Sequence, residues 1–357
     1  MELDRPFLKL PFIFDKAVLA GEVERVLPEQ WLPHPSGLPG NTAVPLVAIN
    51  GEPRDGFDGQ MAATEVLRNS PYLMQVVSSF GEVVARSRLM RLAPGAEVQE
   101  HVDFNYHWYS RVRIHVPIIT EPSVRFFCGQ EEVHMAAGEA WLFDSWRRHR
   151  VINGSPSDRI HLVIDIAGSA RFWRMVRQVQ RSPESSEPSR IAFDEQANPS
   201  LMTERFPAAP VMAPGEMSAI VTELMADCSA NPDNDQAVLE YYHDLLFDLV
   251  HDWRNHWSLY GFMAEGFEGY QRLLQQAQGA LKPDPRVLVT QSNKVGINPI
   301  INQRLLAAAL RPSRAKEVVR GVIKGDEVLF VAPQKRVLQI VIQQILVSIV
   351  RRAVAVG

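Results

Sequence analysis

Three residues in this chain have the types and the spacing of a metal site. His101 and Asp103 stand two positions apart, and His149 follows them far along the chain. Two imidazoles and one carboxylate on one face of an ion form the triad that holds Fe(II) and leaves open positions for a cosubstrate and O2. Arg159, soon after the second histidine, can hold a dicarboxylate such as 2-oxoglutarate by a bidentate, charge-assisted fork. Together the four residues predict an iron-dependent oxygenase.

Short β-strands are the elements that must position these side chains. On a strand, His101 and Asp103 would face the same side. Many short strands at close spacing, separated by turns that contain Gly and Pro, predict a sandwich or jelly roll over about 80–168. The β-rich runs are 86–92, 111–120, 124–128, 140–143, 149–153 and 160–166.

One of these runs alternates polar and apolar side chains and places Arg111, Arg113 and His115 on one face. In a jelly roll that encloses a site, those groups would point into its mouth. A strand with one face in solvent would show the same pattern. An HxD pair also arises by chance in many chains with 10 histidines, so the pattern alone leaves both interpretations open.

The rest of the 357-residue chain predicts two domains joined by a linker. Residues 1–180 form the predicted catalytic domain, whose N-terminal α/β segment has strands at 8–14 and 44–49. Helices are expected there at 16–27, where Asp15 is the predicted N-cap, and at 65–80. A polar, Pro-interrupted linker covers 181–200. A mostly helical C-terminal domain covers 201–357, with helices at 216–226, 237–253, 267–280, 302–310, 314–323 and 336–350.

Composition excludes several classes of protein. A net charge of −4 gives no basic footprint for nucleic acid. Two distant cysteines, Cys128 and Cys228, exclude a disulfide framework or a Cys-rich zinc site and fit a reducing cytosol. No apolar signal segment follows Met1, so a cytoplasmic location is expected. The most apolar stretch, 337–350, is too short for a membrane span and is interpreted as a buried or interface helix, with a membrane-surface helix as the alternative.

A family resemblance emerges from the order and spacing of several motifs. They are 92–95 leading to His101, then 111–118, 138–145, 149–155 and 158–165. Residues about 85–167 resemble the aspartyl/asparaginyl β-hydroxylase family of Fe(II)/2-oxoglutarate-dependent oxygenases, which includes bacterial proline hydroxylases. The N-terminal segment is similar more loosely, through 10–15, Trp31, His34 and 44–46, and residues after about 180 show no resemblance.

The resemblance implies a double-stranded β-helix and a role for each motif residue. His101 and His149 match the iron ligands, and Arg159 matches the partner of the distal carboxylate of 2-oxoglutarate. Arg113 and His115 match positions that help hold the cosubstrate near its chelating end. The vertebrate protein-modifying members lack the ligand carboxylate, whereas this chain has Asp103, as the bacterial free-proline hydroxylases do. Asp103 therefore favours a three-ligand centre and hydroxylation.

These observations predict a dioxygenase that hydroxylates an unactivated C–H of an amino acid residue and converts 2-oxoglutarate to succinate. The extra helical domain favours a peptide, protein or carrier-bound substrate, and Asp103 favours a free amino acid. Arg111, Asn105 and Trp108 are the candidate substrate residues, with structural roles as the alternative. A non-catalytic jelly-roll binding module and a metalloenzyme without 2-oxoglutarate are the competing hypotheses. The aromatic-rich helices after 236 are candidates for a homodimer interface or a contact with the oxygenase domain.

Overall fold

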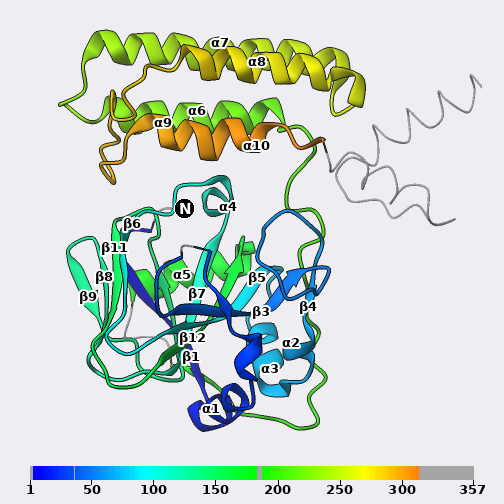
Figure 1. Ribbon diagram of the computed structural model, residues 1–357, viewed down its shortest axis with the longest axis vertical. Coiled ribbons are helices and arrows are strands. Elements are labelled where there is room, and N and C mark those ends of the chain that lie inside the picture. The colour runs from blue at the N-terminus through cyan, green and yellow to red at the C-terminus, as the bar shows by residue number, and fades with distance from the viewer. Residues whose placement is uncertain (1–2, 36, 183–186, 313–357) are drawn as a thin grey trace, which may run out of the picture. The chain divides into compact units, whose positions relative to one another are not determined.

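The computed structural model describes residues 3–35, 37–182 and 187–312 (Figure 1). Residues 1–311 form one compact unit. The helices expected at 314–323 and 336–350, and with them the apolar stretch 337–350, lie outside the described residues. None of the described helices is both long and apolar enough to cross a membrane.

Two β-sheets form the core of the N-terminal half. The larger sheet has the order β13-β1-β10-β7-β12-β5-β3-β2 with β4 paired to β3, and the smaller one has the order β6-β11-β8-β9. From β5 onward the chain passes repeatedly between the sheets, which is the topology of a double-stranded β-helix, so the predicted jelly roll is confirmed. The strands are β1 Phe7–Phe14, β2 Leu32–Pro33, β3 Asn41–Ile49, β4 Met61–Ala63, β5 Val84–Leu92, β6 Glu97–His101, β7 Val112–Ile119, β8 Val124–Cys128, β9 Glu131–Val133, β10 Glu139–Phe143, β11 His149–Asn153, β12 Arg159–Ile166 and β13 Ser189–Ile191.

Apolar side chains from both sheets meet between them. Leu92 and Phe143 of the larger sheet share a buried cluster with Phe126 and Val151 of the smaller one. The rings of Phe126 and Phe143 lie 4.8 Å apart between their centroids. This packing closes the two sheets on each other and leaves the open end of the sandwich for polar residues.

Helices of the N-terminal segment cover the larger sheet. Asp15 caps α1 (Lys16–Glu24) by accepting hydrogen bonds from the amides of Ala17 and Val18, as predicted. The single helix expected over 65–80 is wrong, because the structure has α2 (Glu65–Arg68) and α3 (Pro71–Ser79). Pro71 has no N–H to continue a helix and disfavours helical backbone at the residue before it, so the chain restarts there.

The segment predicted as a linker lies along the β core. β13 pairs in parallel with β1. Further on, Met202 accepts a backbone hydrogen bond from Val84, and Glu204 accepts one from Met61. The segment therefore adds to the larger sheet before the chain enters the C-terminal helices. The domain boundary at 181–200 stays a prediction.

The C-terminal helices share a core of their own (Figure 1). Tyr242, Trp253 and Tyr270 are completely buried in it, and the expected aromatic-rich interface with the oxygenase domain or across a dimer stays a prediction. Val102 and Trp146 of the N-terminal half join the same apolar cluster. The elements are α6 Pro214–Ser229, α7 Gln236–Tyr260, α8 Phe267–Ala280, α9 Ile297–Ile300, a π-helical turn Ile301–Leu306 and α10 Ala307–Ala309, with α5 Ala170–Arg181 preceding them.

Candidate metal centre

His101, Asp103 and His149 come together at one end of the smaller sheet. His101 ends β6 and His149 begins β11, and the two residues are register partners on these antiparallel strands. Their ring centroids lie 4.1 Å apart. Strand β6 ends before Asp103, so the expectation that one strand carries both His101 and Asp103 is wrong. Asp103 is held instead by its backbone amide, which donates to the carbonyl of Ser145 at 3.0 Å.

The three side chains point metal-ligating atoms at one another. The Nε2 atoms of His101 and His149 lie 3.9 and 4.0 Å from the two carboxylate oxygens of Asp103. One ligand atom from each residue falls within 4.8 Å of the others. Two imidazole nitrogens and one carboxylate oxygen at this spacing fit one divalent transition-metal ion bound on a single face.

Backbone carbonyls set the tautomer of both histidines. The Nδ1 atom of His101 lies 2.8 Å from the carbonyl of Gln99, and that of His149 lies 2.9 Å from the carbonyl of Arg147. A carbonyl only accepts, so each Nδ1 carries the proton and each Nε2 presents its lone pair to a metal. Burial lowers the pKa of His149 to about 4 despite the nearby Asp103, which keeps this imidazole neutral as a ligand must be.

Arg159 is a buried cation without a carboxylate partner in the described part of the chain. It begins β12 and is 5% exposed. One Nη donates to Nδ1 of His161 at 2.8 Å, and Nε has no hydrogen-bond partner. Burial lowers the pKa of Arg159 to about 9. Burying an unpaired charge is costly, so a guanidinium in this state indicates a place for an anionic ligand.

His115 lies between Arg159 and the metal ligands. Its ring lies 5.7 Å from that of His161 and 5.3 Å from that of Phe143, and Phe143 in turn lies 4.8 Å from the ring of His149. The Nε2 atoms of His115 and His161 are buried without partners. Burial, and next the charge of Arg159, holds the pKa of both imidazoles well below the ordinary value. Two buried, neutral imidazoles are therefore neighbours of Arg159, His161 directly and His115 through His161.

Arg113 is engaged differently from His115. Its Nε donates to Asp165 at 2.8 Å, and its guanidinium lies 4.2 Å from the centroid of the Trp108 ring. Asp165 also accepts from Arg86 and from His107, at 3.2 and 3.3 Å. Burial alone would raise the pKa of Asp165, but Arg113 and its other cationic and hydrogen-bonding neighbours hold that pKa well below its usual range. The cosubstrate role of Arg113 stays a prediction, and its present partner is this buried carboxylate.

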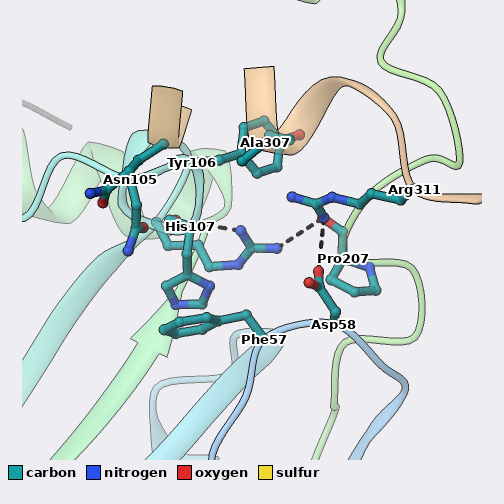
Figure 2. A pocket seen from close by; sticks show the side chains of 11 residues that line it. Phe57, Asp58, Asn105, Tyr106, His107, Pro207, Ala307 and Arg311 are labelled. Atoms are coloured by element: carbon teal, nitrogen blue, oxygen red, sulfur yellow. Dashed lines mark hydrogen bonds and ion pairs between the residues drawn. The ribbon is translucent and has the colours of Figure 1, made fainter. Parts of the chain in front are cut away.

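The candidate substrate residues lie around the short helix α4 (Tyr106–Tyr109). The side-chain oxygen of Asn105 caps this helix by accepting from the amide of Trp108, which is itself buried over Arg113. Arg111 donates to Glu204 and to the carbonyl of Pro207. Figure 2 shows Asn105 and His107 with Pro207 around a pocket of about 270 Å³. The Arg111 guanidinium thus binds protein groups, and the three substrate roles stay predictions.

Sequence reasoning missed two groups of residues. Arg88 on β5 is buried, its Nε has no partner, and its Nη1 lies 3.3 Å from Asp55. Its signal was the Arg86-Ser87-Arg88 alternation, which places both arginines on one strand face. The second group includes Arg304, whose Nε donates to the carbonyl of Phe104 from 200 positions away. Nothing local in the sequence pointed to that contact.

Comparison with known proteins confirms the resemblance. Residues 57–168 match the family model described as aspartyl/asparaginyl beta-hydroxylase, and this range contains the whole triad and Arg159. This segment is similar to the aspartyl/asparaginyl β-hydroxylase family, and the match covers less than half of the chain. The L-proline cis-4-hydroxylase of Rhizobium meliloti (strain 1021) is 26% identical to this chain over 138 residues, which is 37% of this chain and 49% of that protein. The chain thus spans about half the length of this curated relative.

Solved structures give only distant matches. A prolyl-4-hydroxylase from Pseudomonas putida is 14% identical with a TM-score of 0.31, and the match covers 46% of this chain and 95% of that one. A cupin domain from Bordetella pertussis is 23% identical with a TM-score of 0.19, over 23% of this chain and 79% of that one. TM-scores this low do not establish a common fold. The jelly-roll assignment of the hydroxylase segment therefore depends on its own sheet order.

Proposed function

We propose that this chain is an Fe(II)- and 2-oxoglutarate-dependent dioxygenase that hydroxylates an unactivated C–H bond of an amino acid residue. The observation that carries the proposal is the pairing of two features: a His-Asp-His triad, and a buried arginine with no carboxylate partner in the described chain that is linked to the triad through contacts of His161, His115 and Phe143. A metal site alone would fit many functions. A second site for a carboxylate, separated from the triad by His115 and Phe143, fits a chelating dicarboxylate.

The residues present fit both groups that this function requires. The donor set of two neutral imidazoles and one carboxylate suits Fe(II), and His101, Asp103 and His149 would hold it. Arg159 would hold the distal carboxylate of 2-oxoglutarate, with the partnerless Nε2 atoms of His115 and His161 as neighbouring polar groups. When bound, iron and 2-oxoglutarate would activate O2: one oxygen atom would enter the C–H bond as the product hydroxyl, and the other would enter succinate as 2-oxoglutarate loses CO2.

The protein contributes orientation and exclusion of water. The carbonyls of Gln99 and Arg147 fix the two imidazoles, so the ligand atoms need little rearrangement to meet the metal. Phe126 and Phe143 pack against each other behind His149 and keep that side of the centre apolar. In such surroundings the attraction between Arg159 and a carboxylate is stronger than in water. His101, whose side chain is 43% exposed, marks the open side of the centre.

We further propose that the amino acid residue is part of a peptide, protein or carrier-bound substrate and resembles aspartate, asparagine or proline. Support comes from a cavity of about 690 Å³ lined by Tyr109 and Trp146 of the N-terminal half and by α6 residues such as Leu224. That volume is larger than a free amino acid needs. Free proline remains the alternative, since the curated relative is named for that substrate. Succinate formation with free amino acids, compared with the same residues in capped peptides, tests the choice.

The decisive experiment is anaerobic reconstitution with Fe(II) and 2-oxoglutarate, followed by visible absorption for the weak charge-transfer band of the chelate. We expect a band that is absent in His149→Ala and needs more 2-oxoglutarate in Arg159→Ala. A folded, iron-loaded protein without the band would favour a metalloenzyme that does not use 2-oxoglutarate. A folded protein that binds no iron would favour a non-catalytic binding module.

A further inference from the structure

The cavity of about 690 Å³ is bounded by both halves of the chain. Tyr109 and Trp146 contribute aromatic rings from the N-terminal half, and Glu223 and Asp227 contribute carboxylates from α6. Arg304, from the π-helical turn Ile301–Leu306, also lines the cavity. π-Helical turns are rare and recur at functional sites. Arg304 lies in this turn and is the one cationic side chain among the described residues that line the cavity.

Arg304 is held rigidly but its outer end has no partner. It is 7% exposed, and its Nε donates to the carbonyl of Phe104 at 3.1 Å. The guanidinium carbon lies 4.1 Å from the ring centroid of Trp146 and 5.2 Å from that of Tyr109. Within the described residues, neither of its Nη atoms donates a hydrogen bond and no carboxylate lies within 4.0 Å. Two parallel N–H groups are thus available for an end-on fork to a planar anion.

The carboxylates of the cavity are already bonded to other groups. Asp227 accepts from the amide of Ser292 at 2.9 Å and from its hydroxyl. Burial, and next the charge of Glu223 and a hydrogen bond to it, raises the pKa of Tyr109 to about 12. Burial lowers the pKa of Arg304 to about 10 while Tyr109, Glu223 and Asp227 oppose that shift. Two nearby negative charges repel a dianion such as phosphate more strongly than a monoanion, so of these two the cavity favours a single carboxylate on Arg304.

This cation also lies beside the segments that carry the metal ligands. Phe104, which accepts from Arg304, directly follows Asp103. Trp146, which stacks on Arg304, directly follows Ser145, whose carbonyl accepts from the amide of Asp103. A group bound to Arg304 would therefore lie next to Trp146 and near the chain segment that follows Asp103.

We propose that Arg304 binds a carboxylate of the substrate in this cavity, so that the C-terminal helices supply a specificity-determining residue to the hydroxylase centre. That the ligand is the substrate rests on the proposed function. The carboxylate can be the C-terminus of a short peptide or an acidic side chain near the hydroxylated residue. Both sources offer the same planar monoanion to the guanidinium fork.

The test measures peptide binding to the full-length, iron-free chain by saturation-transfer NMR, which needs neither turnover nor oxygen. The first probe pair is N-acetyl-prolyl-glycine and its carboxamide. The second pair is the carboxamides of N-acetyl-prolyl-aspartate and N-acetyl-prolyl-asparagine. We expect the carboxylate member of at least one pair to bind roughly 10- to 100-fold more tightly than its neutral partner, as a charge-assisted hydrogen-bond pair implies. The pair that discriminates identifies the source of the carboxylate.

Arg304→Gln should abolish this discrimination, and Arg304→Lys should reduce it, since it keeps the charge without the planar fork. Arg148→Gln is the matched control, because Arg148 also joins the two halves through the carbonyls of Asn293 and Lys294 but does not line the cavity. If Arg304→Gln does not fold, the lysine variant decides.

Equal binding of both members of each pair, no binding at all, or discrimination that survives in the folded Arg304 variants would overturn the proposal. A loss of discrimination in Arg148→Gln as well would overturn it too, because Arg304 would then act only in docking the two halves. The charge-transfer band is a separate measurement. A band without discrimination refutes this inference alone, and discrimination without a band refutes the hydroxylase instead.

Discussion

Arg159 should stabilise the complex with 2-oxoglutarate and should lower the free energy of unfolding of the protein without 2-oxoglutarate. We predict that Arg159→Met raises the free energy of unfolding of the iron-free protein while it weakens 2-oxoglutarate binding. Burial lowers the pKa of Arg159 from 12.5 to about 9, which corresponds to about 5 kcal/mol of cost for the charged form. Methionine fills a similar space without a charge. It leaves Nδ1 of His161 without its donor, a loss of about 1–3 kcal/mol, so the net gain is about 2–4 kcal/mol.

The same substitution removes the proposed fork to the distal carboxylate. Truncating one partner of a buried charge pair costs about 2–5 kcal/mol, or roughly 30-fold or more in affinity. Urea unfolding of the iron-free protein measures the first effect. Titration of the visible Fe(II)–2-oxoglutarate band measures the second. The two effects have opposite signs, which a general loss of structure cannot produce.

Arg88→Met is the matched control for this prediction. Burial also lowers the pKa of Arg88 to about 9, but Arg88 has an anionic partner, Asp55, whereas Arg159 has none among the described residues. This variant should leave 2-oxoglutarate affinity unchanged. An Arg159→Met protein less stable than the parent would show that Arg159 is not an unpaired buried charge. Unchanged 2-oxoglutarate affinity would show that the distal carboxylate binds elsewhere.

Two further predictions concern the histidines. His149→Ala should lose iron in a metal assay after desalting, whereas His161→Ala, equally buried but outside the triad, should retain it; iron kept in both would refute the triad. Burial lowers the pKa of His107 to about 4. The unfolded chain therefore binds this proton at a higher pH than the folded protein does. The stability contributed by neutral His107 is complete above pH 6.5 and is lost as the pH falls towards 4. At pH 5 the loss is about 2 kcal/mol for this residue, so thermal unfolding of iron-free His107→Asn should depend less on acid than the parent; an identical pH dependence would contradict the shift.

The candidate metal ligands could be found in the sequence because their residue types and spacing are local features. An HxD pair on one short strand and a second histidine on another bring three ligand side chains together when those two strands pair. Even so, Asp103 lies beyond the end of β6 and is held by Ser145, which strand alternation did not indicate. Arg159 was found by its distance in sequence from His149, but only the fold could show that it is buried without a carboxylate partner among the described residues.

The residues that were missed depend on contacts between distant parts of the chain. Helical periodicity predicted a helix over 302–310, yet it could not show that Ile301–Leu306 is a π-helical turn that presents Arg304 to Phe104. Arg111 shows the same limit. Its place on a polar strand face suggested a substrate contact, which stays a prediction, and only the structure shows its partner Glu204, 93 positions further along the chain.

The contacts between the two halves of residues 1–311 argue that the C-terminal helices are part of the metal centre. Trp146 donates to Ser292, and Arg148 donates to the carbonyl of Asn293; both precede His149 on the segment that enters β11. Arg304 holds the residue after Asp103. Two of the three ligands are thus flanked by residues that the helices bind directly. A domain attached only for localisation would have no reason to contact these segments, so the helices are better understood as the second wall of the site.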